Sequence, residues 1–339
     1  MSSKTRYALL TVDTEALPKR ASHDHVKRLI WGEHEKGRAG IREMCSLGDD
    51  VGAKHVFFTD MCGAYSYLEE VKEVVRWLDV QGQDVQLHTH PEYLPESFWP
   101  RHKLAYKPRY MNQFADDKAE FVISHFGKLM SSITGKKIQA FRAGSFRWNA
   151  ATLRALAKAD IPLSFNNTMC ALHLKQCLYS VPTNLPYQWS NGLVEVPVTE
   201  RNIIPRAKKG AWWARLQYPE SRFVRYRPWW CSFLPFTISK RNPLLVFLLH
   251  SWSLMTWDEN GHATYTNDQR IEGYRKLLKQ LAKDYDIITT TDFLELMRAG
   301  KITPTHTEDI AKSELIVADK KRQSKAPASL SATAGGASL

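Results

Sequence analysis

The chain has 339 residues, of which 43% are hydrophobic, and its formal net charge is +12 at pH 7 with an isoelectric point near 9.4. This length and composition fit one barrel-sized domain or two ordinary ones, and they exclude a chain that is disordered over most of its length. The positive charge favours acidic partners and leaves nucleic acid, anionic lipid and phosphorylated or uronic sugars open.

The first residues contain no apolar signal core and lead directly into an apolar run at 7–12. The longest apolar run, 243–249, is far too short to cross a bilayer, because a transmembrane helix needs about 20 apolar residues. The five cysteines show no Cys-x-x-Cys spacing and indicate neither a disulfide framework nor a thiolate zinc site. We therefore expect a cytoplasmic protein with at most peripheral contact with membranes.

Apolar runs typical of strands alternate with helical periodicity along most of the chain. The predicted strands are 6–13, 54–59, 84–90, 138–142, 163–165, 193–198, 244–249 and 286–290. The predicted helices are 40–47, 67–80, 114–132, 150–158, 269–284 and 292–298. This alternation predicts an α/β protein with a parallel sheet or barrel inside and helices outside.

Two segments do not follow the alternation. Residues 201–241 hold ten Lys or Arg, a single acid and four Trp, which predicts a lid that faces substrate or membrane. The alternative is a basic loop whose tryptophans pack on the barrel. From residue 305 the composition turns to Lys, Ser, Ala and Gly, so we expect a barrel domain over 1–304, with 201–241 as an insertion, and a disordered tail over 305–339.

His88 and His90 are the first candidates for chemistry. Alternate residues of a strand point to the same face, so the two imidazoles share one side. Their Cα atoms are expected roughly 6 to 7 Å apart, a span that two side chains can close around one metal ion. Pro91 ends the strand there and places the pair at its carboxyl end, where parallel α/β proteins keep their active sites. A core histidine beside an exposed one is the alternative.

The same rule brings ionisable residues to the ends of three other strands. Asp13 and Glu15 share a face, Arg142 ends the strand at 138–142, and His250 follows the strand at 244–249. Singly, these residues fit ordinary roles as a cap, a salt-bridge anchor and a core histidine. Together they supply the ligands, base, orienting group and acid of a metal-assisted hydrolase.

The order of these motifs resembles that of the polysaccharide deacetylase superfamily, the carbohydrate esterases with the NodB-homology domain, over most of the chain from about Leu10 to Met297. Four segments resemble the family's successive motifs: 11–15 (Thr-Val-Asp-Thr-Glu), 87–91 (Leu-His-Thr-His-Pro), 141–144 (Phe-Arg-Ala-Gly) and 248–250 (Leu-Leu-His). The resemblance implies an irregular (β/α) barrel of about seven strands and a metal-dependent hydrolase that removes N-acetyl or O-acetyl groups from an amino sugar or polysaccharide precursor.

The resemblance also implies a role for each site residue. The metal ligands are Glu15, His88 and His90, the catalytic base is Asp13, the acid is His250, and Arg142 orients the base. The family's first motif has adjacent aspartates, whereas Thr14 separates Asp13 from Glu15 here, so the roles of base and ligand could exchange. Mixed histidine and carboxylate ligands fit a divalent metal such as Zn²⁺, with cobalt, nickel and iron left open.

Charge and expected location suggest an anionic substrate, linked to a nucleotide or a lipid, and no specific nucleic acid partner. One alternative is a hydrolase of other carbon–nitrogen bonds, such as those of a cyclic ureide. Another is a catalytically silent sugar-binding protein, because one residue separates the two histidines where the family has three. A two-carboxylate glycosidase that uses Asp13 and Glu15 is less consistent with side chains so close together.

Overall fold

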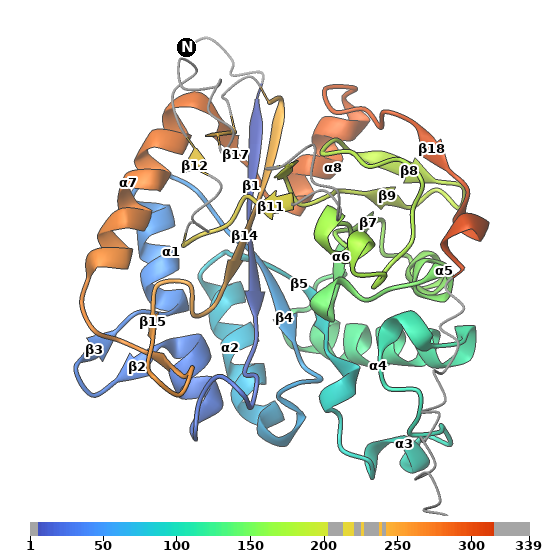
Figure 1. The fold of residues 1–339 in the computed structure, drawn as a ribbon, viewed down its shortest axis with the longest axis horizontal. Coiled ribbons are helices and arrows are strands. Elements are labelled where there is room, and N and C mark those ends of the chain that lie inside the picture. Colours follow the sequence, from blue (N-terminus) through green and yellow to red (C-terminus); the bar gives the residue numbers. More distant parts are fainter. Residues whose placement is uncertain (1–5, 203–212, 220–224, 227–236, 239–241, 315–339) are drawn as a thin grey trace, which may run out of the picture.

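The structure is a computed structural model that describes residues 6–202, 213–219, 225–226, 237–238 and 242–314. Within these residues, one sheet of ten strands forms the centre of the fold, in the order β14-β1-β4-β5-β6-β7-β9-β8-β18, with β17 paired to β1 (Figure 1). Its strands are β1 (Tyr7–Thr14), β4 (Val56–Asp60), β5 (Asp84–Thr89), β6 (Ala140–Ala143), β7 (Leu163–Ser164), β8 (Tyr187–Trp189), β9 (Val194–Glu195), β14 (Leu244–His250), β17 (Asp286–Ile287) and β18 (Thr307–Glu308).

Seven neighbouring strands of this sheet, from β14 to β9, run parallel to one another. The sheet curls into a half-barrel, which confirms the predicted α/β class and the irregular barrel of about seven strands. Thr11 and Val12 of β1 are buried, as are all residues of β4, because helices and the curled sheet cover both faces.

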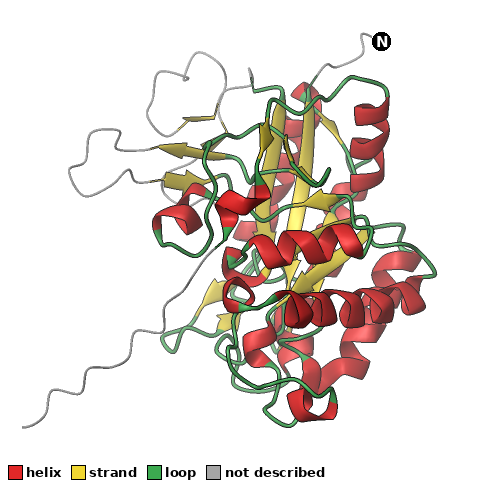
Figure 2. Cartoon of the chain, turned by 90° about the vertical axis from the view of Figure 1, so that its right-hand side faces the viewer, coloured by secondary structure: helices red, strands yellow, loops and turns green. Residues whose placement is uncertain are grey.

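The helices lie outside the strands (Figure 2). They are α1 (Ile41–Asp49), α2 (Leu68–Val80), α3 (Phe98–Arg101), α4 (Asp116–Thr134), α5 (Ala150–Lys158), α6 (Met169–His173), α7 (Gln269–Asp284) and α8 (Thr290–Arg298). Each long helix buries one stripe; α2, for example, buries Val71, Val74, Val75 and Leu78 at helical spacing. The predicted strand at 286–290 is shorter than expected because the Thr289 side chain accepts a hydrogen bond from the backbone of Asp292 and starts α8.

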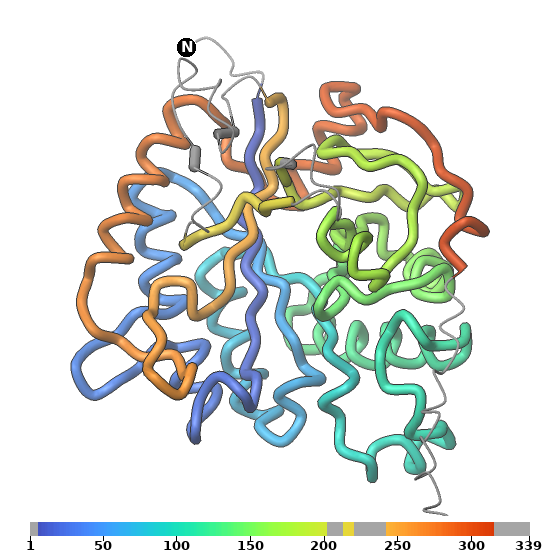
Figure 3. The backbone as a smooth tube through the Cα atoms, viewed as in Figure 1, coloured from blue at the N-terminus to red at the C-terminus, as the bar shows by residue number. Residues whose placement is uncertain are grey.

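Strands that are far apart in the sequence lie side by side at the centre. β14 pairs with β1 in parallel along its whole length, from Leu244 beside Tyr7 to His250 beside Asp13. The blue and orange parts of the chain therefore run together in Figure 3. This pairing joins the last predicted motif to the first.

The lid predicted at residues 201–241 would lie outside the core, but the part of it that the structure describes contributes buried residues. Ala214 and Leu216 are buried, and Leu216 joins Thr199 to β14: its N–H donates to the Thr199 carbonyl, and its carbonyl accepts from Leu248 N–H, at 2.7 and 2.9 Å. The free polar edge of β14 needs partners, and this segment supplies them. Most of the predicted lid, 203–212, 220–224, 227–236 and 239–241, lies outside the described residues, as does the predicted membrane contact.

The predicted boundary at residue 304 also needs correction. β18 pairs with β8, and the buried Glu308 carboxylate accepts the backbone N–H groups of Ser180 and Val181 at 2.8 and 2.7 Å. Residues 305–314 thus belong to the folded unit despite their polar composition. The remaining part of the predicted tail, 315–339, lies outside the described residues. None of the described helices has the length and apolarity to cross a membrane.

A buried histidine links the start of β4 to α7 and makes stability depend on pH. The His55 Nε2 atom lies 2.7 Å from the Tyr274 hydroxyl, and burial lowers the pKa of His55 from 6.5 to about 4. In the unfolded chain His55 therefore binds a proton below pH 6.5, whereas in the folded chain it binds one only below about pH 4. This stabilising contribution is complete above pH 6.5 and decreases as the pH falls toward 4.

We predict that His55→Gln makes the free energy of unfolding less sensitive to pH between 6.5 and 4. The wild type should lose about 3 kcal/mol more than the variant over this range, since each pKa unit is worth about 1.4 kcal/mol. Urea unfolding at a series of pH values measures both slopes. Parallel slopes would mean that His55 does not resist protonation in the folded chain.

Candidate metal centre and catalytic site

The register of the parallel strands aligns ionisable residues at one edge of the sheet. Asp13 of β1 lies beside His250 of β14, and His88 of β5 lies beside Asp60 of β4 and Arg142 of β6. These residues are the last or nearly the last of their strands, and the carboxyl ends of parallel strands meet at the same edge. Residues that the sequence keeps far apart therefore meet there.

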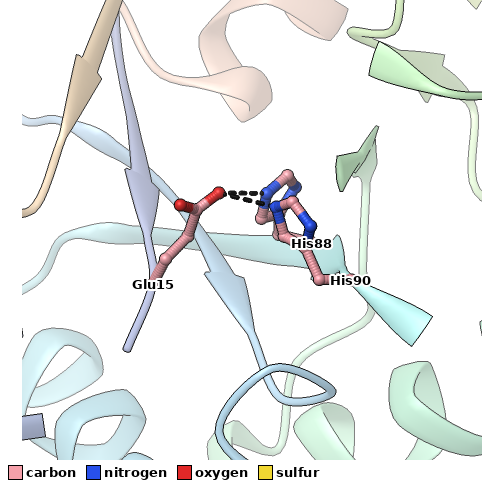
Figure 4. A group of neighbouring side chains, drawn as sticks. All are labelled: Glu15, His88 and His90. Atoms are coloured by element: carbon pink, nitrogen blue, oxygen red, sulfur yellow. Dashed lines mark hydrogen bonds and ion pairs between the residues drawn. The ribbon is translucent and has the colours of Figure 1, made fainter. Parts of the chain in front are cut away.

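Glu15, His88 and His90 form a compact buried cluster (Figure 4). The Glu15 Oε1 atom lies 2.9 Å from His88 Nε2 and 2.9 Å from His90 Nε2. The three candidate ligand atoms lie within 4.8 Å of one another, and all three side chains are almost fully buried. This set could hold one metal ion, with two imidazoles and a carboxylate as donors.

The outer nitrogen of each imidazole has a hydrogen-bond acceptor. His88 Nδ1 lies 2.7 Å from the Arg142 carbonyl oxygen, and His90 Nδ1 lies 2.9 Å from Glu92 Oε1. A carbonyl or a carboxylate can only accept, so each Nδ1 carries the hydrogen and each neutral ring turns its Nε2 lone pair toward Glu15. Two lone pairs and a carboxylate oxygen that face one another require a cation between them, or protons on the rings.

The pKa shifts of Glu15 and His90 also indicate that positive charge stabilises the cluster. Burial acts to raise the pKa of Glu15, but the charges and hydrogen bonds of His90 and His88 outweigh it and hold this pKa well below its usual range. Burial acts to lower the pKa of His90, but Glu15 and Glu92 raise it well above its ordinary value. The donor set thus fits a divalent cation, which would take the place of the protons on the two rings.

Asp13 has a different surrounding from Glu15. The fully buried Arg142 donates from Nη1 to Asp13 Oδ1 at 2.6 Å and from Nη2 to the Thr11 hydroxyl at 2.8 Å. Its Nε donates to the Phe165 carbonyl at 3.2 Å, so the guanidinium is fixed on three sides. Asp13 is consequently paired with the guanidinium of Arg142, whereas Glu15 faces both imidazoles.

His250 stands on the other side of the two carboxylates. Asp13, Glu15 and His250 place one ligand atom each within 4.8 Å of one another. The His250 ring stacks on Trp252, with ring centroids 4.9 Å apart and an interplanar angle of 18°. Burial lowers the pKa of His250, which makes its imidazolium a stronger acid.

A cavity of about 370 Å³ opens above these groups, and its lining includes Asp13, Glu15, His90 and His250. Gly144 allows the chain after β6 to pass close to the cluster, because a Cβ there would lie 2.5 Å from His90 Nδ1. Ser145 and Phe146 follow with φ of 53° and 54°, values that side-chain-bearing residues seldom adopt and that recur at functional sites. The cavity wall is therefore built from a tight, unusual turn.

The six site residues predicted from sequence all lie at this edge, and two neighbouring carboxylates were missed. Glu92 binds His90 Nδ1, and Asp60 Oδ1 accepts the backbone N–H of His90 at 3.1 Å and that of Cys62 at 2.8 Å. Asp60 follows the predicted strand at 54–59, so the rule that found Asp13 could have found it too. Glu92 lies in a short helical turn after Pro91, and the sequence gives no signal for its contact with His90.

Comparisons with known proteins show the fold. No family model matches the chain, and no curated protein sequence matches it. A protein from Mycobacterium smegmatis assigned as a polysaccharide deacetylase is similar in structure, with a TM-score of 0.52 and 13% identity over 89% of this chain and 93% of that one. A 4-alpha-glucanotransferase from Thermococcus litoralis has a TM-score of 0.52 and 11% identity over 89% of this chain and 40% of that one.

The first likeness shows that the chain shares its fold with a protein assigned as a polysaccharide deacetylase, in agreement with the resemblance of its motifs. The second shows that related barrels occur in proteins named for a different reaction. A fold alone therefore does not fix the chemistry, which has to be argued from the site.

We predict that His88→Ala and His90→Ala each abolish stoichiometric metal binding, because the loss of one imidazole leaves two protein ligands in the cluster. Metal content of the purified, folded variants, measured by mass spectrometry of the element, checks this. Circular dichroism establishes that each variant is folded. A variant that retains a full equivalent of metal would remove His88 or His90 from the ligand set.

Glu92→Ala should weaken metal binding by roughly 10- to 100-fold while it leaves the three candidate ligands in place, since the partner of a ligand histidine fixes its orientation. Competition with a chelator of known affinity measures the change. Glu96→Ala is the matched control, because Glu96 is an exposed carboxylate on the same loop. Equal affinities of the two variants would mean that Glu92 does not support His90.

Proposed function

We propose that the chain is a metal-dependent hydrolase that removes an acetyl group, in the first place an N-acetyl group, from an amino sugar or a polysaccharide precursor. The observation that carries this proposal is the convergence of two imidazole Nε2 atoms on the Glu15 carboxylate, at 2.9 Å each, beneath a cavity that also contains Asp13 and His250. Ligand set, base and acid thus lie together at one face of the cavity. The likeness in fold to a polysaccharide deacetylase gives additional support.

Glu15, His88 and His90 would hold the metal, and zinc fits two imidazoles and a carboxylate best. A bound divalent ion polarises an acetyl carbonyl and lowers the pKa of water. The geometry favours Glu15 over Asp13 as the carboxylate ligand, because Glu15 Oε1 contacts both rings whereas Asp13 Oδ1 accepts from Arg142.

The other residues supply the proton transfers that amide hydrolysis requires. Asp13 takes a proton from the attacking water, and Arg142 keeps this carboxylate oriented through its hydrogen bond at 2.6 Å. His250 gives a proton to the departing nitrogen when the carbon–nitrogen bond breaks, while Trp252 fixes the plane of its ring. The products are acetate and a free amine.

The geometry argues against the two-carboxylate glycosidase. Retaining and inverting glycosidases need carboxyl groups roughly 5 to 9 Å apart, one of them protonated. Here the two imidazoles hold the pKa of Glu15 well below its usual range, and Asp13 accepts a hydrogen bond from the buried Arg142 at 2.6 Å. Such a pair suits a base beside a metal ligand.

The test is acetate release from a panel of N-acetylated and O-acetylated sugars by the zinc-loaded protein. We expect acetate and free amine in equal amounts, loss of activity after chelation and recovery on addition of zinc. Asp13→Asn and His250→Ala should each lower turnover by roughly 10² to 10⁴ and retain the metal, since general acids and bases contribute about that much.

Other outcomes point to the competing functions. A ring-opened product without acetate would indicate a hydrolase of other carbon–nitrogen bonds. Unaltered sugar with full metal occupancy would indicate a sugar-binding protein without catalysis. Loss of metal in Asp13→Asn together with its retention in Glu15→Gln would exchange the roles of the two carboxylates.

A further inference from the structure

Two arginines line the cavity above the candidate metal centre, and neither is needed to neutralise its carboxylates. Arg142 already holds Asp13, and two imidazoles face Glu15. Arg215, from the short strand β11 (Trp213–Arg215), is half-buried in the cavity wall, and Arg20 is exposed at its lining. Among the described residues, no carboxylate lies within the 4.0 Å of an ion pair from either guanidinium.

Aromatic rings position both guanidinium groups. The Arg215 Cζ atom lies 5.6 Å from the centroid of the Phe146 ring, which also lines the cavity. The Arg20 Cζ atom lies 4.9 Å from the Trp257 ring, and Trp257 contacts Trp252 edge to face at 6.4 Å. A guanidinium on an aromatic face is oriented while its N–H groups stay available for a ligand.

The charge of Arg215 affects two ionisable groups, His250 in the cavity and Glu200 on the neighbouring strand. Burial lowers the pKa of His250, and Arg215 adds to this effect. Glu200 is the cross-strand neighbour of Arg215, and burial raises its pKa to about 7 against the influence of Arg215. A purely structural role as the counter-ion of Glu200 is therefore the alternative, although no ion pair joins these two described residues.

We propose that the cavity takes an acetylated sugar that also carries an anionic group, a carboxylate or a phosphate, and that Arg215 and Arg20 bind this group. The planar fork of a guanidinium matches both anions, which it holds by two parallel hydrogen bonds. The inference rests on the proposed function for the acetyl group but not for the anion. Arg215 and Arg20 would thus make the cavity prefer an acidic substrate.

The test compares three probes by calorimetry on the zinc-loaded full-length protein. N-acetylglucosamine is neutral, N-acetylglucosamine 1-phosphate carries a phosphate, and 2-acetamido-2-deoxyglucuronate carries a carboxylate. We expect one or both anionic probes to bind roughly 10- to 100-fold more tightly than the neutral probe, which is what hydrogen bonds to a charged group contribute. The probe that binds more tightly shows whether the site recognises a phosphate or a carboxylate. Acetate release, measured on the same probes, separates turnover from binding.

Variants locate the effect. Arg215→Gln should remove most of the advantage of the anionic probe with little change for the neutral one, and Arg215→Lys should restore part of it, because lysine keeps the charge but loses the fork. Arg20→Gln should reduce the advantage less, since Arg20 is exposed and more strongly screened. Arg147→Gln is the matched control, because Arg147 rests on Tyr110 with its Cζ 4.3 Å from the ring and does not line the cavity.

The outcomes distinguish this inference from the function on which it rests. Equal binding of all three probes, or an anionic advantage that survives Arg215→Gln, would overturn the anion site while acetate release could still support the hydrolase. Equal loss of affinity for all probes in Arg215→Gln would make Arg215 a structural partner of Glu200. Anion binding that depends on Arg215 without acetate release from any probe would retain the anion site and reject the hydrolase.

Discussion

The buried guanidinium of Arg142 is the group on which the arrangement of the site depends. It lies on β6, donates to Asp13 and Thr11 of β1, and donates to the Phe165 carbonyl after β7. The carbonyl of the same residue accepts from His88 Nδ1 of β5 and thereby sets which ring nitrogen faces Glu15. One residue thus fixes the proposed catalytic base and the tautomer of one candidate metal ligand.

A buried charge of this kind is costly unless its partners are complete. Arg142 has an anionic partner, a hydroxyl and a carbonyl, and the Phe58 ring lies 4.4 Å from its Cζ. Glu15 lacks such a fixed cation and has instead two imidazoles whose outer nitrogens are occupied. This contrast between two carboxylates two residues apart is the physical basis for proposing Asp13 as the base and Glu15 as the metal ligand.

The fold by itself leaves the reaction open. Chains named for deacetylation and for glucan transfer share this architecture at similar TM-scores. The chemistry of a parallel α/β protein depends on the groups at the carboxyl edge of its strands, and the architecture does not fix those groups. In this chain that edge combines a candidate metal-ligand set, an arginine-bound carboxylate, a stacked histidine and two arginines without carboxylate partners among the described residues.

The sequence by itself determined the alternation of strands and helices and the six residues at the carboxyl edge, because periodicity and the two faces of a strand are local properties. It did not determine that Glu92 turns back to His90, that residues 213–219 complete the edge of β14, or that Glu308 anchors residues 305–314 to the sheet. These contacts involve segments that the sequence assigns to a loop, an insertion or a tail, and only the tertiary structure shows which buried groups they satisfy. The position of Arg215 at the cavity was decided in the same way, because it follows from the pairing of β11 with β10 (Glu200–Asn202) and not from the basic composition of the segment.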